Sequence, residues 1–403
     1  MKYVAVLGYG TIGSGVVEVL RENAALIAAR AGEAIEVRKV LDLRDFPGDP
    51  VEEILVHDYE EIAADPQIDI VVECMGGVGA AYTFVKRALE QGRSVCSSNK
   101  ELVAAKGAEL LRIAKEHDCN FFFEASVGGG IPIIRPLATC LTAEDVEEVL
   151  GILNGTTNFI LTKMEREGAD YGETLKEAQR LGYAELHPEA DVEGWDACRK
   201  IAILTSLVTG KTVNYEQIPT MGITGITAED FKAARFFGAG IKLIARSFKA
   251  EGQFYAMVAP MLVPEAHPLH AVNDVFNGIF VHGNMVDDTM FYGRGAGKCP
   301  TASAVVADVI EAAKLGRSYG SYGWSEEAYE LGDPARICTR FMVRLKETGP
   351  EVQERVREIF GEVMWGPADA GETVFVTEAL GQREFAEKAA QAGTFLGAVR
   401  VCD

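Results

Sequence analysis

The chain has 403 residues, 48% of them hydrophobic, and a formal net charge of −21. This length exceeds one ordinary domain and predicts two or three. The negative charge argues against nucleic acid as a partner, because the nucleic-acid backbone is itself a polyanion. No apolar run approaches the roughly 18 residues that a membrane helix needs. We therefore expect a cytoplasmic protein without a membrane partner.

Eight cysteines are scattered along the chain without a CxxC pair, and the six histidines do not cluster with them. This spacing does not fit a zinc site or a disulfide framework. We expect reduced, mostly buried thiols.

Residues 1–133 alternate between predicted strands and predicted helices. The strands are expected at 3–7, 35–43, 69–74, 94–96 and 121–123, and the helices at 15–29, 80–91 and 107–117. This alternation predicts an α/β fold, with a doubly wound Rossmann-type parallel sheet forming a dinucleotide-binding domain.

The pattern changes from Val146 onward, where long helical spans separate strand-like pieces. We expect an α+β domain for substrate binding and dimerisation over 134–292, and a helix over 293–317 that returns to the dinucleotide domain. Residues 318–338 lack apolar periodicity and are expected to form a linker. The order strand, helix, strand, strand, helix, strand over 339–403 predicts a ferredoxin-like βαββαβ module. We expect this module to be dispensable for chemistry.

Three glycines, Gly8, Gly10 and Gly13, form a GxGxxG turn after a predicted strand and before a predicted helix. The first glycine permits the tight turn, the second lets the backbone approach a pyrophosphate, and the third lets the helix pack on the strand. In this context the motif predicts dinucleotide binding.

The second predicted strand is followed by Asp42 and Arg44. An acid at this place usually bonds the ribose hydroxyls of NAD, and a nearby arginine usually pairs with the extra phosphate of NADP. Since both residues are present, the choice between NAD and NADP stays open.

Two further loops follow predicted strands of the same sheet. Lys100 ends a Ser-Ser-Asn-Lys loop, at the strand edge where doubly wound sheets bind ligands. The loop at 124–132 contains three consecutive glycines, whose exposed carbonyls suit a hard cation or a close ligand. An interdomain hinge explains this second loop equally well.

Charged and polar side chains gather in the second predicted domain. Asp196 and Lys200 lie four residues apart on a predicted helix, with Glu185 and Asp191 just upstream. The carboxylates could bind a substrate ammonium, and Lys200 could meet a carbonyl oxygen that gains charge during hydride transfer. The polar stretch 154–158, which includes Thr156, could hold a substrate carboxylate or cap a helix.

Together these residues resemble the homoserine dehydrogenases. The substrate loop of that family has a long and specific pattern, and here it reads Ala178, Gly182, Tyr183, Ala184, His187, Pro188, Asp191, Gly194, Asp196 and Lys200. The loops at 98–100, 128–134, 154–158 and 295–303 also resemble family motifs. The likeness covers residues 1 to about 316, and the tail resembles an ACT regulatory module that lacks the usual aspartate in its ligand loop.

The resemblance implies roles for individual residues. Lys200 would protonate the aldehyde oxygen, Asp196 would orient it, and Glu185 and Asp191 would bind the substrate ammonium. Lys100 would lie beside cofactor and substrate. The cofactor would be lined by Thr11, Ile12, Gly182 and Gly297. A sodium ion would be held, largely through backbone carbonyls, by Glu124, Val127, Gly129 and Ile131.

The expected function is NAD(P)-dependent interconversion of L-aspartate 4-semialdehyde and L-homoserine by a homodimer or homotetramer. Two alternatives remain at this point. One is another NAD(P)-dependent dehydrogenase of small amino or hydroxy acids, and the other is a non-catalytic amino-acid sensor. Occupation of the cation site and binding of an amino-acid effector to the C-terminal module are also left open.

Overall fold

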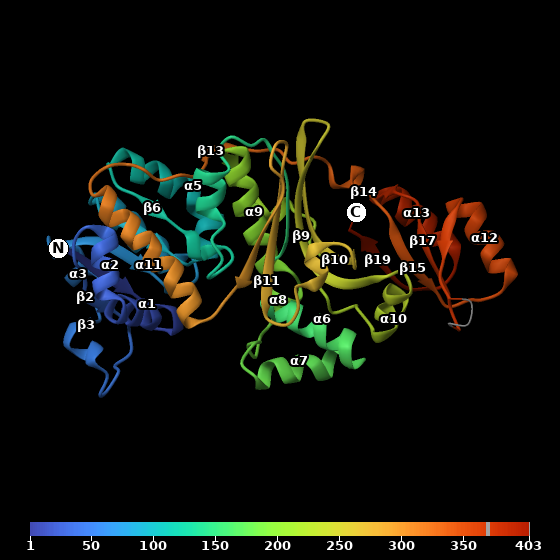
Figure 1. Cartoon of the computed structure of the whole chain (residues 1–403), viewed down its shortest axis with the longest axis horizontal. Coiled ribbons are helices and arrows are strands. Elements are labelled where there is room, and N and C mark those ends of the chain that lie inside the picture. The colour runs from blue at the N-terminus through green and yellow to red at the C-terminus, as the bar shows by residue number, and fades with distance from the viewer. Residues whose placement is uncertain (368–370, 403) are drawn as a thin grey trace. The chain divides into compact units, whose positions relative to one another are not determined.

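The computed structural model describes residues 1–367 and 371–402 (Figure 1). The chain divides into two compact units. The first contains 1–145, 202–215 and 291–330, and the second contains 146–201, 216–290 and 331–403. Residues 368–370 and 403, inside the predicted C-terminal module, lie outside the described part. None of the described helices is long and apolar enough to cross a membrane.

The first unit contains a parallel sheet with the order β3-β2-β1-β4-β5-β6 among the described residues. Its strands are β1 (Lys2–Leu7), β2 (Ile35–Leu41), β3 (Leu55–Val56), β4 (Ile68–Glu73), β5 (Ser94–Ser97) and β6 (Phe121–Phe122). This order confirms the predicted doubly wound sheet. The direction of the connections reverses between β1 and β4, and such a reversal opens a ligand crevice at the carboxyl ends of the strands.

Helices of the first unit cover this sheet (Figure 1). They are α1 (Thr11–Glu22), α2 (Ala24–Ala31), α3 (Glu60–Ala63), α4 (Gly79–Glu90), α5 (Lys100–Glu116) and α11 (Lys298–Leu315). The single helix predicted at 15–29 is in fact two, because the chain leaves helical geometry at Asn23, with φ −103° and ψ 18°. A small sheet joins β8 (Lys211–Thr212) to β13 (Ser325–Ala328). Strand β13 lies within 318–338, the segment that was expected to be a linker.

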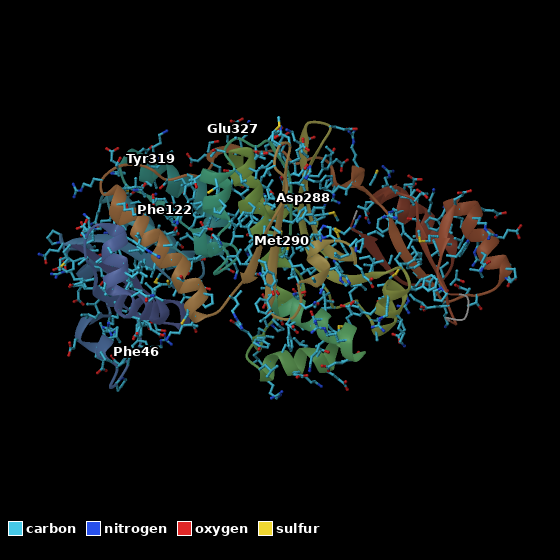
Figure 2. The ribbon with its side chains drawn as sticks, in the orientation of Figure 1. Phe46, Phe122, Asp288, Met290, Tyr319 and Glu327 are labelled. Atoms are coloured by element: carbon cyan, nitrogen blue, oxygen red, sulfur yellow. The ribbon has the colours of Figure 1, made fainter. Side chains whose placement is uncertain are left out.

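The core of the first unit lies between the sheet and the helices α1 and α11. Val16 of α1, Val305 of α11 and Phe122 of β6 are all fully buried there; Figure 2 labels Phe122. A Cβ on Gly15 would lie 2.9 Å from the Lys298 side chain, so glycine allows α11 to pack closely on α1. The return helix thus fixes the helix whose N-terminus faces the glycine turn.

The second unit contains a mixed sheet with the order β12-β11-β7-β9-β10-β19-β15-β17-β16 among the described strands. These are β7 (Val146–Ile152), β9 (Ala239–Ala250), β10 (Gln253–Pro264), β11 (Phe276–Gly283), β12 (Asp287–Arg294), β15 (Phe341–Leu345), β16 (Val363–Trp365), β17 (Thr373–Thr377) and β19 (Phe395–Val401). A separate pair joins β14 (Cys338–Thr339) to β18 (Leu380–Gly381). The last four strands in the order, with α12 (Pro350–Phe360) and α13 (Gln382–Ala392), match the predicted ferredoxin-like module.

The remaining helices of the second unit precede or follow its strands. They are α6 (Gly155–Glu167), α7 (Tyr171–Arg180), α8 (Glu189–Val192), α9 (Trp195–Thr209) and α10 (Ala228–Phe236). Residues of α9 from Ala202 onward belong to the first unit. The second unit therefore carries the predicted substrate residues up to Lys200.

The C-terminal segment shares a sheet and a core with strands β9 and β10 of the second unit. Strand β19 pairs in parallel with β10, with Met261 opposite Arg400. Ile337 and Cys402 pack in the same buried cluster as Met261 and Tyr255. The sequence did not predict this continuity, because the two strands have few residues in register and lie far apart along the chain.

Candidate functional site

The turn between β1 and α1 has the geometry of a pyrophosphate cradle. Gly8 has a φ of 92°, which favours glycine, and a Cβ on Gly13 would lie only 1.8 Å from Gly8 O. No described atom lies within 4 Å of the place a Cβ would take on Gly10. Within the described part of the chain, no side chain caps α1, which begins at Thr11 and continues with Ile12. The backbone amides there can approach an anion.

A cavity of about 690 Å³ lies over this turn. Its size is typical of small-molecule sites. Phe46, labelled in Figure 2, forms part of its wall. The lining residues are Tyr9, Gly10, Thr11, Ser14, Val17, Glu18, Arg21, Glu22, Arg44, Phe46, Asp49 and Lys298. The cavity, the open Gly10 and the helix N-terminus together fit a dinucleotide.

Asp42 and Arg44 form a two-point ion pair at the end of β2. Arg44 Nε and Nη2 each donate to the Asp42 carboxylate at 3.0 Å, and Tyr9 N donates to it at 2.8 Å. The bonded Arg44 guanidinium holds the pKa of Asp42 at about 2. The guanidinium also lies over the Phe46 ring, 5.1 Å from its centre. Asp42 is therefore ionised, but its charge is compensated before any cofactor arrives.

Lys100 follows the carboxyl end of β5, as the sequence predicted, but it is the first residue of α5, seven residues before the predicted start of this helix at 107. Asn99 caps this helix by accepting from Leu102 N at 3.1 Å, and its amide donates to Gly77 O at 2.7 Å. The fully buried Glu73 accepts from Ser97 Oγ at 2.6 Å and from Met75 N at 2.8 Å. Glu73 thus ties together the two loops that precede α4 and α5.

The loop at 124–131 is tightly constrained within the first unit. The Glu124 carboxylate accepts backbone N–H groups of Ile133, Ile134 and Arg135 at 2.6–2.9 Å. Val127 and Ile131 are buried, and a Cβ on Gly129 would lie 2.3 Å from Gly295 O. The loop therefore packs against the segment that reaches Gly297, the residue before α11.

A cation at this loop would depend on main-chain oxygens, because the Glu124 carboxylate already serves three donors. Among the described residues, no group of three or more His, Cys, Asp or Glu side chains could hold a metal ion. The cation and its backbone ligands stay a prediction.

The second unit brings Asp191, Asp196 and Lys200 together at the junction of β7 and α6. Lys200 Nζ donates to Asp196 Oδ2 and to Leu153 O, both at 2.7 Å. Both side chains of this pair are nearly buried, with 10% of Lys200 and 4% of Asp196 exposed. The pair therefore differs from the surface salt bridge that its spacing alone would suggest.

The residue that joins these groups is Asn154, to which the sequence analysis gave no individual role. Its amide Nδ2 donates to Asp191 Oδ1 at 2.7 Å and to Asp196 Oδ2 at 2.9 Å. Its Oδ1 accepts from Thr157 N at 2.8 Å, which caps α6. The helix cap predicted for the 154–158 stretch is therefore confirmed, and the ligand site predicted there stays a prediction.

The loop between α7 and α8 carries the other predicted substrate residues. Thr156 Oγ1 donates to Tyr183 O at 2.7 Å, which ties the start of α6 to this loop. Gly182 has a φ of 76° and ends α7. Glu185 is exposed, and its main-chain oxygen accepts from Gln179 at 3.1 Å. The backbone at Glu185 is thus held by a side chain of α7.

Comparisons with known proteins bear on this arrangement. A family model described as "Homoserine dehydrogenase" matches residues 132–310, and one described as "Homoserine dehydrogenase, NAD binding domain" matches 8–124. The homoserine dehydrogenase of Bacillus subtilis (strain 168) is 40% identical over 352 residues, which cover 85% of this chain and 80% of the relative.

The chain belongs to the homoserine dehydrogenase family. The Mycobacterium tuberculosis (strain ATCC 25618 / H37Rv) homoserine dehydrogenase is 44% identical over 336 residues, covering 81% of this chain and 75% of the relative. A solved homoserine dehydrogenase from Thiobacillus denitrificans matches with a TM-score of 0.92 and 33% identity, covering 100% and 98% of the two chains.

A hyperthermophilic archaeal homoserine dehydrogenase in complex with NADPH matches with a TM-score of 0.65 and 27% identity, covering 77% of this chain and 98% of that one. As a homoserine dehydrogenase, the chain is an NAD(P)-dependent oxidoreductase with an NAD-binding domain. This confirms the expected family, enzyme class and fold.

Sequence reasoning missed two buried acids in addition to Asn154. One is Glu73, the last residue of β4. The signal in the sequence that could have identified it is an acidic residue directly at the end of an apolar strand. The other is Asp308 on α11, fully buried, which accepts from Glu124 N at 2.9 Å and pairs with Arg135. Burial raises the pKa of Asp308 to about 8. Each acid organises a loop of the homoserine dehydrogenase cofactor domain.

Proposed function

We propose that Lys200 is the proton donor when the aldehyde of L-aspartate 4-semialdehyde is reduced to L-homoserine. A bound nicotinamide cofactor supplies the hydride to the aldehyde carbon. Lys200 gives its proton to the oxygen, so that the carbonyl becomes a hydroxyl. In the reverse direction, the same nitrogen takes the proton from the homoserine hydroxyl.

The observation that carries this proposal is the buried Lys200–Asp196 pair. An ammonium has three N–H donors, and among the described residues Leu153 O and Asp196 Oδ2 accept two of them. The third can point at a substrate oxygen. Asp196 keeps the ammonium in place, while Asn154 keeps Asp196 in place.

Glu185 and Asp191 would bind the substrate ammonium. Thr156, in the first turn of α6, would bind the substrate carboxylate. Support comes from the charge of the two carboxylates and from their position on the loop and short helix before Asp196. Lys100 would lie beside the cofactor and substrate at the start of α5. These roles concern ground-state binding, so their loss should raise KM more than it lowers kcat.

We infer that the enzyme accepts both NAD and NADP. Gly8, Gly10, Thr11, Ile12 and Gly13 would hold the pyrophosphate. Gly182 and Gly297 would line the rest of the cofactor. Because Arg44 neutralises Asp42, the acid no longer repels a 2′-phosphate, and the exposed guanidinium can clamp it.

The proposal also includes a sodium ion held by main-chain oxygens of Glu124, Val127, Gly129 and Ile131. Sodium prefers hard oxygen ligands, which this loop can supply, and the loop is fixed by the three N–H bonds to the Glu124 carboxylate. Replacing NaCl by an equal concentration of choline chloride should lower activity if the ion supports the cofactor loops.

We further propose a homo-oligomer in the cytoplasm, with an ACT-like module at 339–403 that responds weakly to threonine. All eight cysteines are free, which fits a reducing compartment. Strand β12 lies at the edge of its sheet and Met285 beside it is 79% exposed, which fits a subunit interface. Light scattering of the purified protein would give the oligomeric state.

A spectrophotometric assay tests the proposed function. NADPH and NADH absorbance should fall on addition of aspartate semialdehyde, and rise from NADP or NAD with L-homoserine. A panel of small hydroxy and amino acids should react far more slowly. Equal rates with another hydroxy acid would favour a different dehydrogenase, and no turnover at all would favour a sensor.

A further inference from the structure

A buried ion triad joins α10 to β15, one of the C-terminal strands (β15, β16, β17 and β19) of the mixed sheet. The Arg344 side chain on β15 is only 5% exposed. Its Nε and Nη2 each donate to the Glu372 carboxylate at 2.8 Å. Its Nη1 donates to Asp230 Oδ1 at 2.8 Å and to Thr227 Oγ1 at 3.0 Å. Arg344 thus holds one carboxylate beside its own strand and another on α10.

Asp230 and Thr227 form the capping box that starts α10. Thr227 N donates to Asp230 Oδ2 at 2.8 Å, and Asp230 N donates to Thr227 Oγ1 at 3.3 Å. Asp230 is itself almost fully buried. Because Arg344 bonds both members of the box, its charge fixes where α10 begins and where the preceding segment ends.

The segment 219–226 precedes this capping box in the chain, pairs with Val258 of β10 and packs against α8. Met221 N donates to Val258 O, and Ile223 N donates to Val192 O, both at 2.8 Å. A Cβ on Gly222 would lie 2.2 Å from Val192 O, so the segment has no room to approach more closely. Val192 is the last residue of α8. A shift of the segment should therefore displace α8.

Helix α8 carries Asp191, one of the carboxylates of the candidate site. Gly194 N donates to Asp191 O at 3.0 Å, and Asn154 Nδ2 donates to Asp191 Oδ1 at 2.7 Å. Lys200, in contrast, is held by Leu153 O at the end of β7. Movement of α8 should thus displace Asp191 more than Lys200.

From these contacts we propose that Arg344 is a positioning residue for substrate binding. Its pair with Asp230 fixes the start of α10, the segment 219–226, the end of α8 and, through them, Asp191. This inference rests on the proposed function of Asp191. Because the cofactor turn belongs to the other unit, loss of Arg344 should change the KM for homoserine and not the KM for the cofactor.

The test compares two variants of the same triad in the full-length enzyme. Arg344→Met removes the bonds to Glu372 and those to α10, whereas Glu372→Gln changes only the carboxylate beside β15 and keeps the bonds from Arg344 to α10. Arg344→Met should raise the homoserine KM on the order of 3- to 30-fold, the range found for residues along such contact networks. The cofactor KM and kcat should change less than about twofold, and Glu372→Gln should be close to wild type in both.

Hydrogen exchange of the segment 219–226 gives a readout that does not depend on substrate. Exchange should be faster in Arg344→Met than in Glu372→Gln. Arg344→Lys, which keeps a charge near Asp230, should recover part of both effects. If Arg344→Met does not fold, Thr227→Val removes the shared hydroxyl without leaving a buried charge, and it should change the homoserine KM in the same direction.

Two results would overturn the inference. One is wild-type exchange of 219–226 together with a wild-type homoserine KM in folded Arg344→Met. The other is an equal rise of KM in Arg344→Met and Glu372→Gln, which indicates general loosening of the C-terminal sheet. Asp191→Asn is measured alongside. If that variant leaves KM unchanged, the proposed role of Asp191 fails, while hydrogen exchange still decides whether Arg344 holds the segment.

Discussion

Asn154 Nδ2 lies 2.7 Å from Asp191 Oδ1, although the two residues are 37 positions apart in the chain. The same amide nitrogen reaches Asp196, and the same side chain caps α6. Folding of this one helix cap therefore assembles the two carboxylates around Lys200.

Two substitutions of Asn154 separate its bridging from its capping. Serine keeps an oxygen that can cap α6 but loses the amide donors, and alanine loses both. A hydrogen bond to a charged group contributes about 1.5–3 kcal/mol, so both variants should raise the homoserine KM roughly tenfold. Both variants should lower the free energy of unfolding, and Asn154→Ala should lower it by about 1 kcal/mol more than Asn154→Ser, because serine keeps the cap. Unchanged KM in both would leave Asn154 with the cap alone.

Replacement of Lys200 by methionine keeps the side-chain volume on α9 but leaves the buried Asp196 carboxylate without its cation. The free energy of unfolding should therefore fall, and kcat is measured on the folded variant. The loss of general acid catalysis should lower kcat by roughly 10²–10⁴-fold. Lys163→Met on α6 is the control, since Lys163 pairs with Glu177 and has no proposed catalytic role. A Lys200→Met enzyme within about twofold of wild type would remove Lys200 from the chemistry.

Arg44→Ala should cost more with NADPH than with NADH. The substitution removes a cation that can clamp a 2′-phosphate, and it also uncovers the Asp42 carboxylate, whose charge Arg44 now compensates. The ratio of kcat/KM values should shift about tenfold or more. Arg30→Ala, at an exposed site on α2, is the control. An equal loss with both cofactors would make Arg44 a bystander.

Lys242 predicts a pH dependence of stability. This lysine on β9 is fully buried, donates to Asn273 at 2.9 Å, and has Glu165, Arg166 and Asp274 as its charged neighbours. Burial lowers its pKa to about 8 from 10.5. Between these values the unfolded chain binds the proton and the folded chain does not, so stability should rise with pH, by up to about 3 kcal/mol.

Urea unfolding of wild type and Lys242→Met from pH 7.5 to 10.5 checks this expectation. The variant lacks the titrating group. The free energy of unfolding of wild type should therefore rise relative to that of the variant as pH increases, by up to about 3 kcal/mol. Parallel curves would show that Lys242 titrates alike in the folded and unfolded chains.

A chain ending at Gly316 should be less stable than the full chain. Such a chain lacks Ile337 and Cys402, which complete the buried cluster around Met261. It also lacks Trp324, which packs against Gly107 of α5. Each buried apolar side chain contributes about 1.5–3 kcal/mol, so we expect aggregation or a lower urea midpoint. A truncated chain with the wild-type midpoint would show that these contacts add no stability. The separate expectation that the module is dispensable for chemistry is tested by the activity of the truncated chain that stays soluble.

Local signals made the first unit predictable. The buried strand at β1, the glycines at 8, 10 and 13 and the regular alternation of strand and helix each depend on neighbours within a few residues. The break at Asn23 was missed because both flanking segments have helical periodicity. The pairing of β19 with β10 could not be predicted, because two residue pairs are in register among the described residues and the strands lie far apart along the chain.

The candidate site was predictable as a set of residue types and not as a geometry. The spacing of Asp196 and Lys200 placed both on one face of a helix, and they are in contact. The sequence could not show that this pair is buried, or that Asn154 bridges two carboxylates, because both facts depend on how α6, α8 and α9 pack. The catalytic and binding roles of these residues stay predictions.

The position of β19 has a consequence for synthesis of the chain on the ribosome. Strand β10 ends at Pro264 and β19 begins at Phe395, so roughly 130 residues must be added before the two can pair. At about 5–20 residues per second, this takes roughly 7–26 seconds. During that interval Met261 and Leu262 of β10 lack the residues of β19 with which they pair. This short apolar stretch of strand edge is a template for association with other chains. A nascent chain stalled after β10 should therefore bind chaperones more strongly than one stalled after β19 has emerged from the ribosome.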